Sequence, residues 1–236
     1  MKKSKLTAIC SELLPDEIVA EIEKRGIRCV AIPKNARLAP AVSTHPDMLC
    51  FILPNGKGIV TEREYYLENT ELFEGLGSAV FSDGVALAAE YPSDIALNAL
   101  LMNGVLYSKT RHTAAQIVKS AERCVEVKQG YSACSVLKLN ERAAITADKG
   151  LAAAMRENGV RVLLIEAGYI LLEGYGYGFI GGASACDGER VWFFGDIYGH
   201  PMGDEIVRFC ENEGLQCVWF EHLPLTDFGG VKFVEN

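Results

Sequence analysis

Apolar and polar positions repeat along the chain in one order: an apolar run, a turn, a second apolar run, an amphipathic helix and a short apolar strand. Four copies are visible inside the chain, with turns near residues 55, 103, 140 and 187. Asn-Gly and Asp-Gly pairs between apolar runs favour tight hairpins, because both central residues of such turns need positive φ. The pattern therefore predicts four ββαβ units of unequal length.

The two ends of the chain supply the parts of a fifth unit. Residues 229–236 predict a first strand, and residues 6–10 predict a second strand that is followed by a helix and by a strand at 28–32. Pairing the ends in one unit removes the exposed strand edges of a linear array. A stacked solenoid is the alternative, but solenoids need polar caps, and neither end resembles one. We therefore favour closure.

The predicted fold is an α/β propeller of five ββαβ units around a pseudo-fivefold axis, closed by pairing of the N- and C-terminal strands and forming one domain over residues 1–236. The units are approximately 229–236 with 5–33, 45–82, 93–128, 131–166 and 178–221. Three long irregular segments, at 33–46, 83–94 and 166–180, each lead into the first strand of the next unit. We expect them to reach the same rim, where binding residues usually collect.

Composition narrows the class of protein. The chain has 236 residues, 49% of them hydrophobic, and no apolar run approaches the roughly 20 residues of a membrane helix. The basic start is followed by an apolar run too short for a signal peptide, so we expect a cytoplasmic protein that does not bind membranes. The net charge of −8 without a basic stripe argues against nucleic acid as a partner. Nothing in the sequence indicates the oligomeric state.

Metal and cofactor sites are not expected. Six of the eight cysteines, Cys10, Cys29, Cys50, Cys124, Cys186 and Cys217, fall in predicted core strands, where a reduced cysteine packs as a small hydrophobe. The chain has no Cys-x-x-Cys pair and no His-x3-His pair, the spacings typical of zinc ligands. Residues 196–204 combine Asp and His, but their place between a strand and a helix indicates helix capping.

Five ββαβ units that share one unit between the chain ends resemble the pentein, or guanidine-modifying enzyme, superfamily. That superfamily contains deiminases, dimethylarginine hydrolases and amidinotransferases, and also ring proteins without catalysis. The resemblance covers nearly the whole chain at the level of its repeats. It implies a cysteine nucleophile in a closing Gly-Gly-x-x-Cys strand, a His-x-Asp motif, and an acidic residue that precedes another Gly-Gly.

The sequence departs from that pattern at the residues that matter for catalysis. The closing strand begins with Gly229-Gly230 and has Phe233 at the position of the cysteine. Ile180 stands where the acidic residue precedes Gly-Gly, and only His45-Pro46-Asp47 keeps the His-x-Asp form. The missing nucleophile argues against ordinary deiminase chemistry.

Candidate site residues follow from the ring, because its first strands line the axis. Polar residues and glycines at the starts of these strands are therefore candidates for a central pocket. As catalytic residues we predict His45, Cys134 and Asp94, and as binding residues Asp47, Asn98, Ser132, Tyr177, Gly181, Gly182, Ser184, Asp227, Gly230 and Lys232.

Each candidate also has a purely structural explanation. The His45 segment precedes a proline and could form a turn, and Asp94 and Asp227 could brace loops. Asn98 lies in an apolar strand, where an unpaired amide is costly, and Cys134 could be packed core. The glycine pairs are explained slightly better by strands crowding at an axis than by a ligand.

The leading hypothesis is a protein that binds a small guanidino-like or amino-acid-like molecule in a central pocket. If it is an enzyme, the resemblance implies hydrolysis or transfer at a C–N bond. Cys134 would then be a displaced nucleophile, His45 the general acid or base, and Asp47 or Asp94 the carboxylate that holds the cation. The alternative is a non-catalytic ring scaffold that presents a protein-binding face.

Overall fold

The computed structural model describes residues 6–54, 58–78 and 80–235, which form five three-stranded sheets. In each sheet the middle strand pairs antiparallel with the first strand of its unit and parallel with the third. The middle strands are β1 (Leu6–Ser11), β4 (Ile59–Glu62), β7 (Val105–Ser108), β10 (Ala143–Thr146) and β13 (Arg190–Phe193). The first strands are β15 (Lys232–Glu235), β3 (Cys50–Ile52), β6 (Leu100–Met102), β9 (Val136–Asn140) and β12 (Ser184–Cys186). The third strands are β2 (Arg28–Ile32), β5 (Val80–Asp83), β8 (Arg123–Glu126), β11 (Arg161–Leu164) and β14 (Gln216–Val218).

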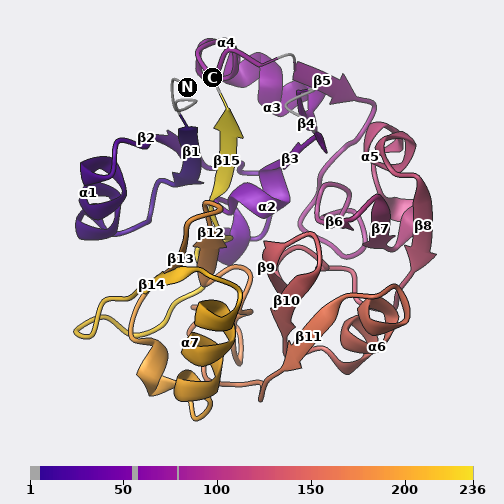
Figure 1. Cartoon of the computed structure of the whole chain (residues 1–236). Coiled ribbons are helices and arrows are strands. Elements are labelled where there is room, and N and C mark those ends of the chain that lie inside the picture. The colour runs from indigo at the N-terminus through magenta and orange to yellow at the C-terminus, as the bar shows by residue number, and fades with distance from the viewer. Residues whose placement is uncertain (1–5, 55–57, 79, 236) are drawn as a thin grey trace, which may run out of the picture.

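The terminal strands pair with each other as predicted. β15 lies antiparallel to β1 in register from Leu6 opposite Glu235 to Ile9 opposite Lys232 (Figure 1). The chain ends thus complete one sheet, β15-β1-β2, of the same kind as the other four. Each of the five sheets draws its three strands from one stretch of the chain or, for β15-β1-β2, from the two chain ends.

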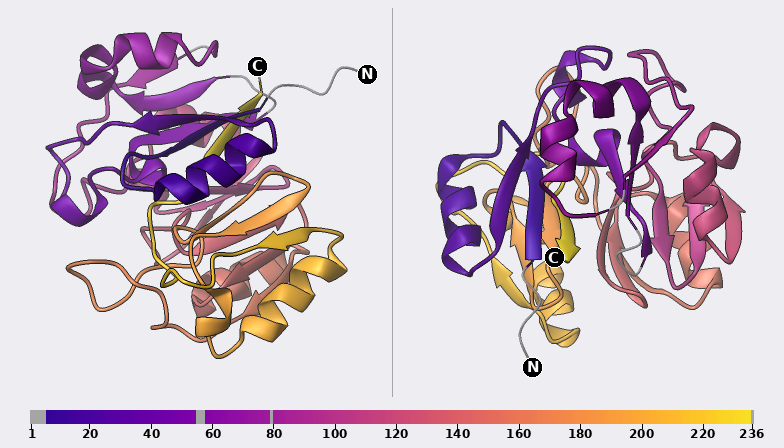
Figure 2. Two further views of the ribbon diagram at one scale, coloured as in Figure 1. Left: turned by 90° about the vertical axis from the view of Figure 1, so that its left-hand side faces the viewer. Right: turned by 90° about the horizontal axis from the view of Figure 1, so that it is seen from above.

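Helices lie on the outer side of the sheets, away from the centre of the molecule (Figures 1 and 2). Between the second and third strands of their units lie α1 (Asp16–Lys24), α3 (Arg63–Glu68), α4 (Thr70–Glu74), α5 (Ala115–Ser120), α6 (Lys149–Glu157) and α7 (Gly203–Asn212). The short helix α2 (Pro46–Leu49) instead precedes β3 on the inner side. Short 3₁₀ turns occur at η1 (Pro40–Val42), η3 (Thr110–His112) and η4 (Ile197–Gly199). In the described residues no helix is long and apolar enough to cross a membrane.

Local sequence signals explain where these elements begin and end. Asp148 caps α6 by accepting a hydrogen bond from the backbone N–H of Leu151 at 2.7 Å, and Gly159 ends the helix with φ of 79°. Asn103 and Gly104 both have positive φ, 48° and 74°, as a tight hairpin turn requires. The predicted turn at 55–57 lies outside the described residues. Asp196 caps η4, in line with the capping role predicted for 196–204.

One core prediction is wrong. Cys124 in β8 is exposed, although its apolar surroundings in the sequence place it in the core. Third strands form the outer edge of each sheet, so only part of their surface is covered. Most residues of β8 are therefore exposed. All eight cysteines are free, and Cys10, Cys50, Cys134 and Cys210 are buried.

Candidate functional site

A pocket of about 250 Å³ opens at the rim where two of the predicted long loops meet the first strands. The 33–46 segment contributes Val42 and His45, and the 166–180 segment contributes the aromatic side of the pocket. The remaining lining residues come from α2 itself and from the segments that lead into β9 and β15. The lining residues are Val42, His45, Met48, Tyr131, Cys134, Leu172, Tyr175, Gly176, Tyr177, Phe179 and Asp227.

His45 lies at the base of this pocket just before α2. Its side chain is buried, and its Nδ1 has no hydrogen-bond partner and lies 3.7 Å from Oδ1 of Asp227. Burial lowers the pKa of His45, against the opposing influence of Asp47, so the imidazole is neutral near pH 7. Gly229, with φ of 76°, passes so close that a Cβ there would lie 2.3 Å from Cβ of His45. The backbone of the closing segment thus packs directly on the imidazole side chain.

Asp227 joins the closing segment to the aromatic loop. Its Oδ2 accepts the N–H of Phe179 at 2.8 Å, and its Oδ1 accepts the N–H of Gly229 at 2.9 Å. The carboxylate packs over Gly182, where a Cβ would lie 1.8 Å from Oδ1. Burial, followed by repulsion from Asp47, raises the pKa of Asp227 to about 7, although the two N–H donors act in the opposite direction. This carboxyl group therefore changes charge in the physiological pH range.

Asp47 and Cys134 are two further buried residues of the site, and Cys134 also lines the pocket. Burial raises the pKa of Asp47, opposed first by Lys232 and then by His45, and its Oδ1 lacks a hydrogen-bond partner. Burial, then the charges of Asp47 and Asp227, raises the pKa of the Cys134 thiol well above its usual range. In the unliganded protein Cys134 is consequently a thiol and not a thiolate.

Asn98 holds Cys134 in place. Its Oδ1 accepts the N–H groups of Ala133 at 2.8 Å and Cys134 at 3.3 Å, and its Nδ2 donates to Sγ of Cys134 at 2.8 Å and to Sδ of Met48 at 3.2 Å. Asn98 was expected within an apolar strand, but it precedes β6, which begins at Leu100, and its amide is fully partnered. Asn98 positions the thiol and does not line the pocket itself.

Aromatic rings form the wall of the pocket. Tyr131 stacks on Phe179 with ring centroids 6.4 Å apart, and Tyr177 meets Phe179 edge to face at 6.2 Å. Asp94 stands behind Tyr131 and accepts its hydroxyl hydrogen bond at 2.6 Å. Asp94 is buried and does not line the pocket, so the structure places this predicted catalytic residue as a support for Tyr131.

The other predicted residues lie elsewhere. Gly181, Ser184, Gly230 and Lys232 line a second, larger cavity, to which the first strands of all five sheets contribute. Ser132 is fully buried and donates its hydroxyl to the carbonyl of Gln129 at 3.1 Å, which is a turn contact. From the sequence we expected all the candidates to line one cavity. In the structure some line one of two cavities, and the others are packed around them.

Several residues of the site carried no sequence signal. Met48, Leu172 and Phe179 are ordinary apolar residues whose role depends on where their segments meet. Glu62, at the end of β4, has the appearance of a surface residue but is buried. No group of three or more His, Cys, Asp or Glu suited to hold a metal ion occurs among the described residues.

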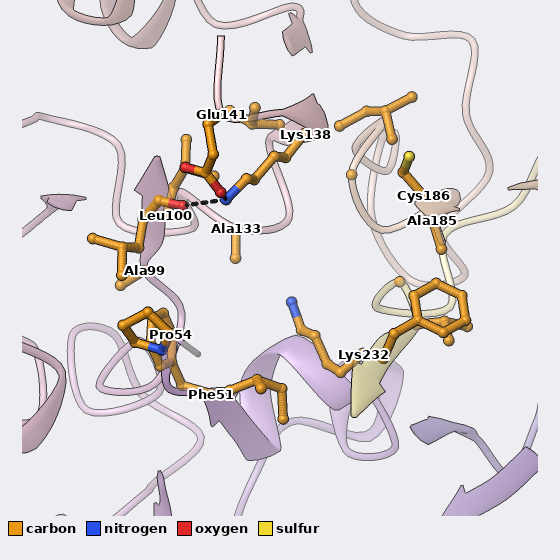
Figure 3. Close-up of a pocket in the computed structure, with 18 of the residues that line it drawn as sticks. Phe51, Pro54, Ala99, Leu100, Ala133, Lys138, Glu141, Ala185, Cys186 and Lys232 are labelled. Carbon is orange, nitrogen blue, oxygen red and sulfur yellow. Dashed lines mark hydrogen bonds and ion pairs between the residues drawn. The ribbon is translucent and has the colours of Figure 1, made fainter. Parts of the chain in front are cut away.

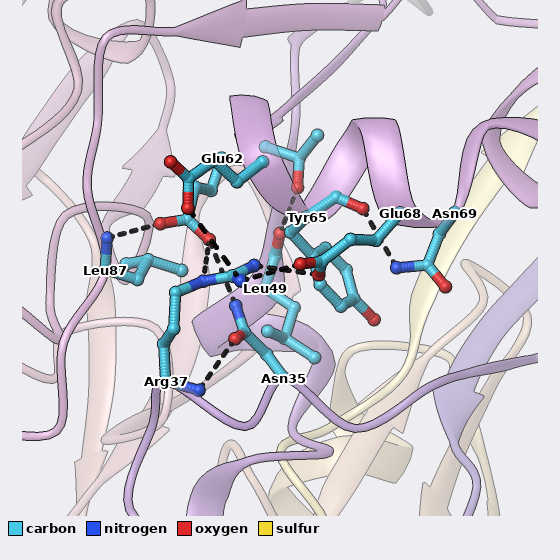
Figure 4. Close-up of polar contacts among 10 residues, drawn as sticks. Asn35, Arg37, Leu49, Glu62, Tyr65, Glu68, Asn69 and Leu87 are labelled. Atoms are coloured by element: carbon cyan, nitrogen blue, oxygen red, sulfur yellow. Dashed lines mark hydrogen bonds and ion pairs between the residues drawn. The ribbon is translucent and has the colours of Figure 1, made fainter.

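Glu62 braces two of the rim loops (Figure 4). Its Oε2 accepts from Nδ2 of Asn35 at 3.2 Å and from Nε of Arg37 at 3.0 Å, both in the 33–46 segment. Its Oε1 accepts the N–H of Leu87 at 2.7 Å, in the 83–94 segment. The first loop leads to His45 and the second to Asp94, so one buried carboxylate ties together the segments that carry them.

Comparison with known proteins identifies the fold class. The chain is similar to dimethylarginine dimethylaminohydrolase from Pseudomonas aeruginosa in complex with citrulline, at TM-score 0.60 and 12% identity over 99% of both chains. It is similar to agmatine deiminase from C. jejuni, at TM-score 0.57 and 10% identity over 99% of this chain and 94% of that one. An amidinotransferase of saxitoxin biosynthesis from Microseira wollei matches at TM-score 0.55 and 11% identity, over 93% of this chain and 78% of that one. The fold is that of the pentein superfamily, as the repeats indicated.

Within that fold the chain has a more specific assignment. It belongs to DUF6873, a family of unknown function, whose profile matches residues 9–232. No curated protein matches the sequence.

Proposed function

We propose that this protein binds a small organic cation, of the guanidinium, amidinium or alkylamine type, in the rim pocket. The observation that carries the proposal is Asp227, a buried carboxyl group with a pKa of about 7 in a pocket walled by aromatic rings. Among the described residues no lysine or arginine forms an ion pair with it. A bound cation would supply the missing counter-charge, and aromatic faces attract cations.

The lining also restricts the rest of the ligand. None of the described residues that line the pocket is a lysine or an arginine, so the carboxylate of a free amino acid would enter an apolar wall without an ionic partner. We therefore replace the broader expectation of an amino-acid-like ligand with a cation that carries an apolar body and no carboxylate. The similarity to enzymes that modify guanidines is consistent with a guanidinium head.

This proposal assumes that the chain works as one closed unit. The pairing of β1 with β15 supports a five-unit propeller and a single domain over the whole chain. Closure brings Asp227, near the C-terminus, next to His45. In a linear array of the same units these two residues would be far apart.

A ligand panel tests the proposal. We expect butylguanidinium to raise the melting temperature, since a ligand at about 100 times its Kd stabilises the folded state by about 2.7 kcal/mol. Two comparison compounds should give much smaller shifts: L-arginine, which carries a carboxylate, and 1-pentanol, an uncharged molecule of similar length to butylguanidinium. A larger shift with L-arginine would contradict the restriction to carboxylate-free cations, and no shift with any cation would contradict the proposed function.

Catalysis would require Cys134 to be activated by the ligand. Burial, and then the charges of Asp47 and Asp227, keep its thiol protonated, and a cation bound beside these carboxylates would offset their field and favour the thiolate. Sγ could then add to the amidinium or guanidinium carbon of the ligand, with the C=N π electrons moving to nitrogen, while the thiol proton passes to a carboxylate or to His45. Return of that proton to an amine nitrogen on the same carbon would let the amine leave, so that one C–N bond breaks for the C–S bond that forms. The thiol would therefore stay protonated and unreactive in the free protein, and it would ionise only when a cation is bound.

Covalent labelling tests this step. We expect 2-chloroacetamidine, which carries the cationic head, to alkylate Cys134 at least tenfold faster than neutral 2-chloroacetamide, each rate being normalised to a free thiol. The exposed Cys124 is an internal control and should show no such preference. Peptide mass spectrometry reports both sites. Equal normalised rates at Cys134 would remove it as a nucleophile while leaving the binding proposal in place.

A non-catalytic ring that docks a partner remains the second candidate, and one observation favours it. Five of the large exposed apolar residues lie in the 83–94 and 166–180 loops, namely Tyr91, Tyr169, Leu171, Tyr175 and Tyr177. If no cation in the panel binds, a docking face at this rim becomes the favoured function.

A further inference from the structure

The centre of the ring contains a second cavity of about 960 Å³ that the proposed function does not use. Every unit contributes to it through its first strand: β3, β6, β9, β12 and β15 all supply lining residues. Small side chains on the inner side, including Ala99, Ala133 and Ala185, leave the axis open (Figure 3). Its volume lies at the upper end of the range typical of small-molecule sites.

The axial cavity and the rim pocket are separate spaces. Among the described residues none lines both of them. Cys134 faces the rim pocket, whereas its neighbours Ala133 and Val136 face the axial cavity. The segment that carries Cys134 therefore forms part of the partition, and the two spaces can be tested independently.

Two ammonium groups enter the axial cavity from different strands. Lys232 of β15 points its Nζ into the open space (Figure 3), and it forms no ion pair or hydrogen bond within the described residues. Lys138 of β9 faces it from another wall, where Nζ donates to the carbonyl of Leu101 at 2.9 Å and to Oε1 of Glu141 at 2.5 Å. Lys138 thus already has an ion pair and a hydrogen bond, whereas Lys232 has neither within the described residues.

The carboxylates of the cavity do not compensate Lys232. Glu141 is 58% exposed and paired with Lys138, and Glu122 is exposed. Asp47 interacts electrostatically with Lys232, but it is buried, forms no ion pair with Lys232 and does not line the cavity. A partly buried ammonium that faces an open space without a hydrogen-bond acceptor is a binding group for an anion.

We propose that the axial cavity binds a small organic anion, whose carboxylate or phosphate group pairs with Lys232 and reaches toward Lys138. The cavity holds a molecule with several acceptor groups, because the two lysines extend from different strands toward the same space. The backbone of Gly230, next to the strand that carries Lys232, lines the same wall. This site is distinct from the cation pocket and has the opposite charge preference.

Titration calorimetry of the full chain with citrate and with inorganic phosphate, at low ionic strength, tests the proposal. We expect saturable binding of at least one of the two anions. Lys232→Met should weaken it by about tenfold or more, the usual effect of removing a hydrogen bond to a charged group. Lys232→Arg should retain most of the affinity, and Lys138→Met should show an intermediate loss.

Two controls make the outcome decisive. Lys149→Met removes an exposed lysine on α6 and should leave anion affinity unchanged, which separates a local site from the effect of net charge. Butylguanidinium binding, measured on the same samples, reports the rim pocket independently. No binding of either anion to the wild-type protein, or equal anion affinity in the wild type and Lys232→Met, would overturn the proposal whether or not the cation binds.

Discussion

Replacing Asp227 by asparagine is expected to weaken butylguanidinium binding by on the order of 100-fold, because the variant removes one partner of a buried charge pair. Calorimetry at pH 8, where the wild-type carboxyl group is ionised, measures this loss. Asp94→Asn is the matched control: Asp94 is also a buried carboxylate, but it supports Tyr131 from outside the pocket. Its asparagine variant still offers an oxygen to the Tyr131 hydroxyl, so its affinity should stay close to that of the wild type.

The same residue predicts a pH dependence. The pKa of Asp227 is about 7 in the folded protein and about 3.9 in an unfolded chain. Between these values the folded state binds more protons than the unfolded state, so this group's contribution to stability is greatest below pH 4 and is lost as the pH rises through 7. Cation affinity should change in the opposite direction and rise toward pH 8, as the carboxylate forms.

Calorimetric titrations from pH 6 to pH 8 check this prediction. The wild-type affinity for butylguanidinium should increase over this range, whereas Asp227→Asn should show a much flatter profile. The same slope in both proteins would assign the titration to another group. A flat wild-type profile would contradict the raised pKa of Asp227 itself.

Replacing Glu62 by leucine is expected to destabilise the protein by about 2–4 kcal/mol, because each buried donor left without its acceptor costs about 1–3 kcal/mol, whereas Arg37 keeps its bidentate pair with Glu68. The side chain of Glu62 is 2% exposed and that of Arg37 is 28% exposed. The substitution leaves Nδ2 of Asn35 and the N–H of Leu87 without their acceptor. Chemical denaturation measures the change in unfolding free energy.

Glu64→Leu is the matched control for Glu62. Glu64 lies two residues further along and also approaches Arg37, at 3.9 Å, but its side chain is 73% exposed. Exposed ion pairs contribute about 0–1 kcal/mol, so this variant should be nearly neutral. Similar losses in the two variants would show that Glu62 does not have the bracing role assigned to it.

Much of the fold could be predicted because its signals are local. Positive φ at Asn103 and Gly104, the Asp148 cap and the left-handed Gly159 are each decided by a few neighbouring residues. The repetition of these signals then indicated five units and the pairing of the chain ends. The third strands were predicted less well, as Cys124 shows, because an apolar strand looks the same whether it is central or at an edge.

The candidate site was predicted only as a set of residues. His45, Cys134 and Asp227 come just before first strands and therefore lie at the rim, whereas Ser184 and Lys232 lie within first strands and face the axis. A shift of a few residues along the chain moves a side chain from one cavity to the other. The sequence order alone does not reveal this boundary.

The sequence by itself determined the five repeated units, their turns and caps and the pairing of the two ends. These properties depend on backbone preferences and on the period of apolar residues, which act over short distances along the chain. Only the tertiary structure decided that Asp227 titrates near pH 7, that Glu62 is buried between two loops and that Lys232 faces an open cavity. Burial and electrostatic interaction depend on what lies nearby in space, and the packing of segments far apart in the sequence determines those neighbours.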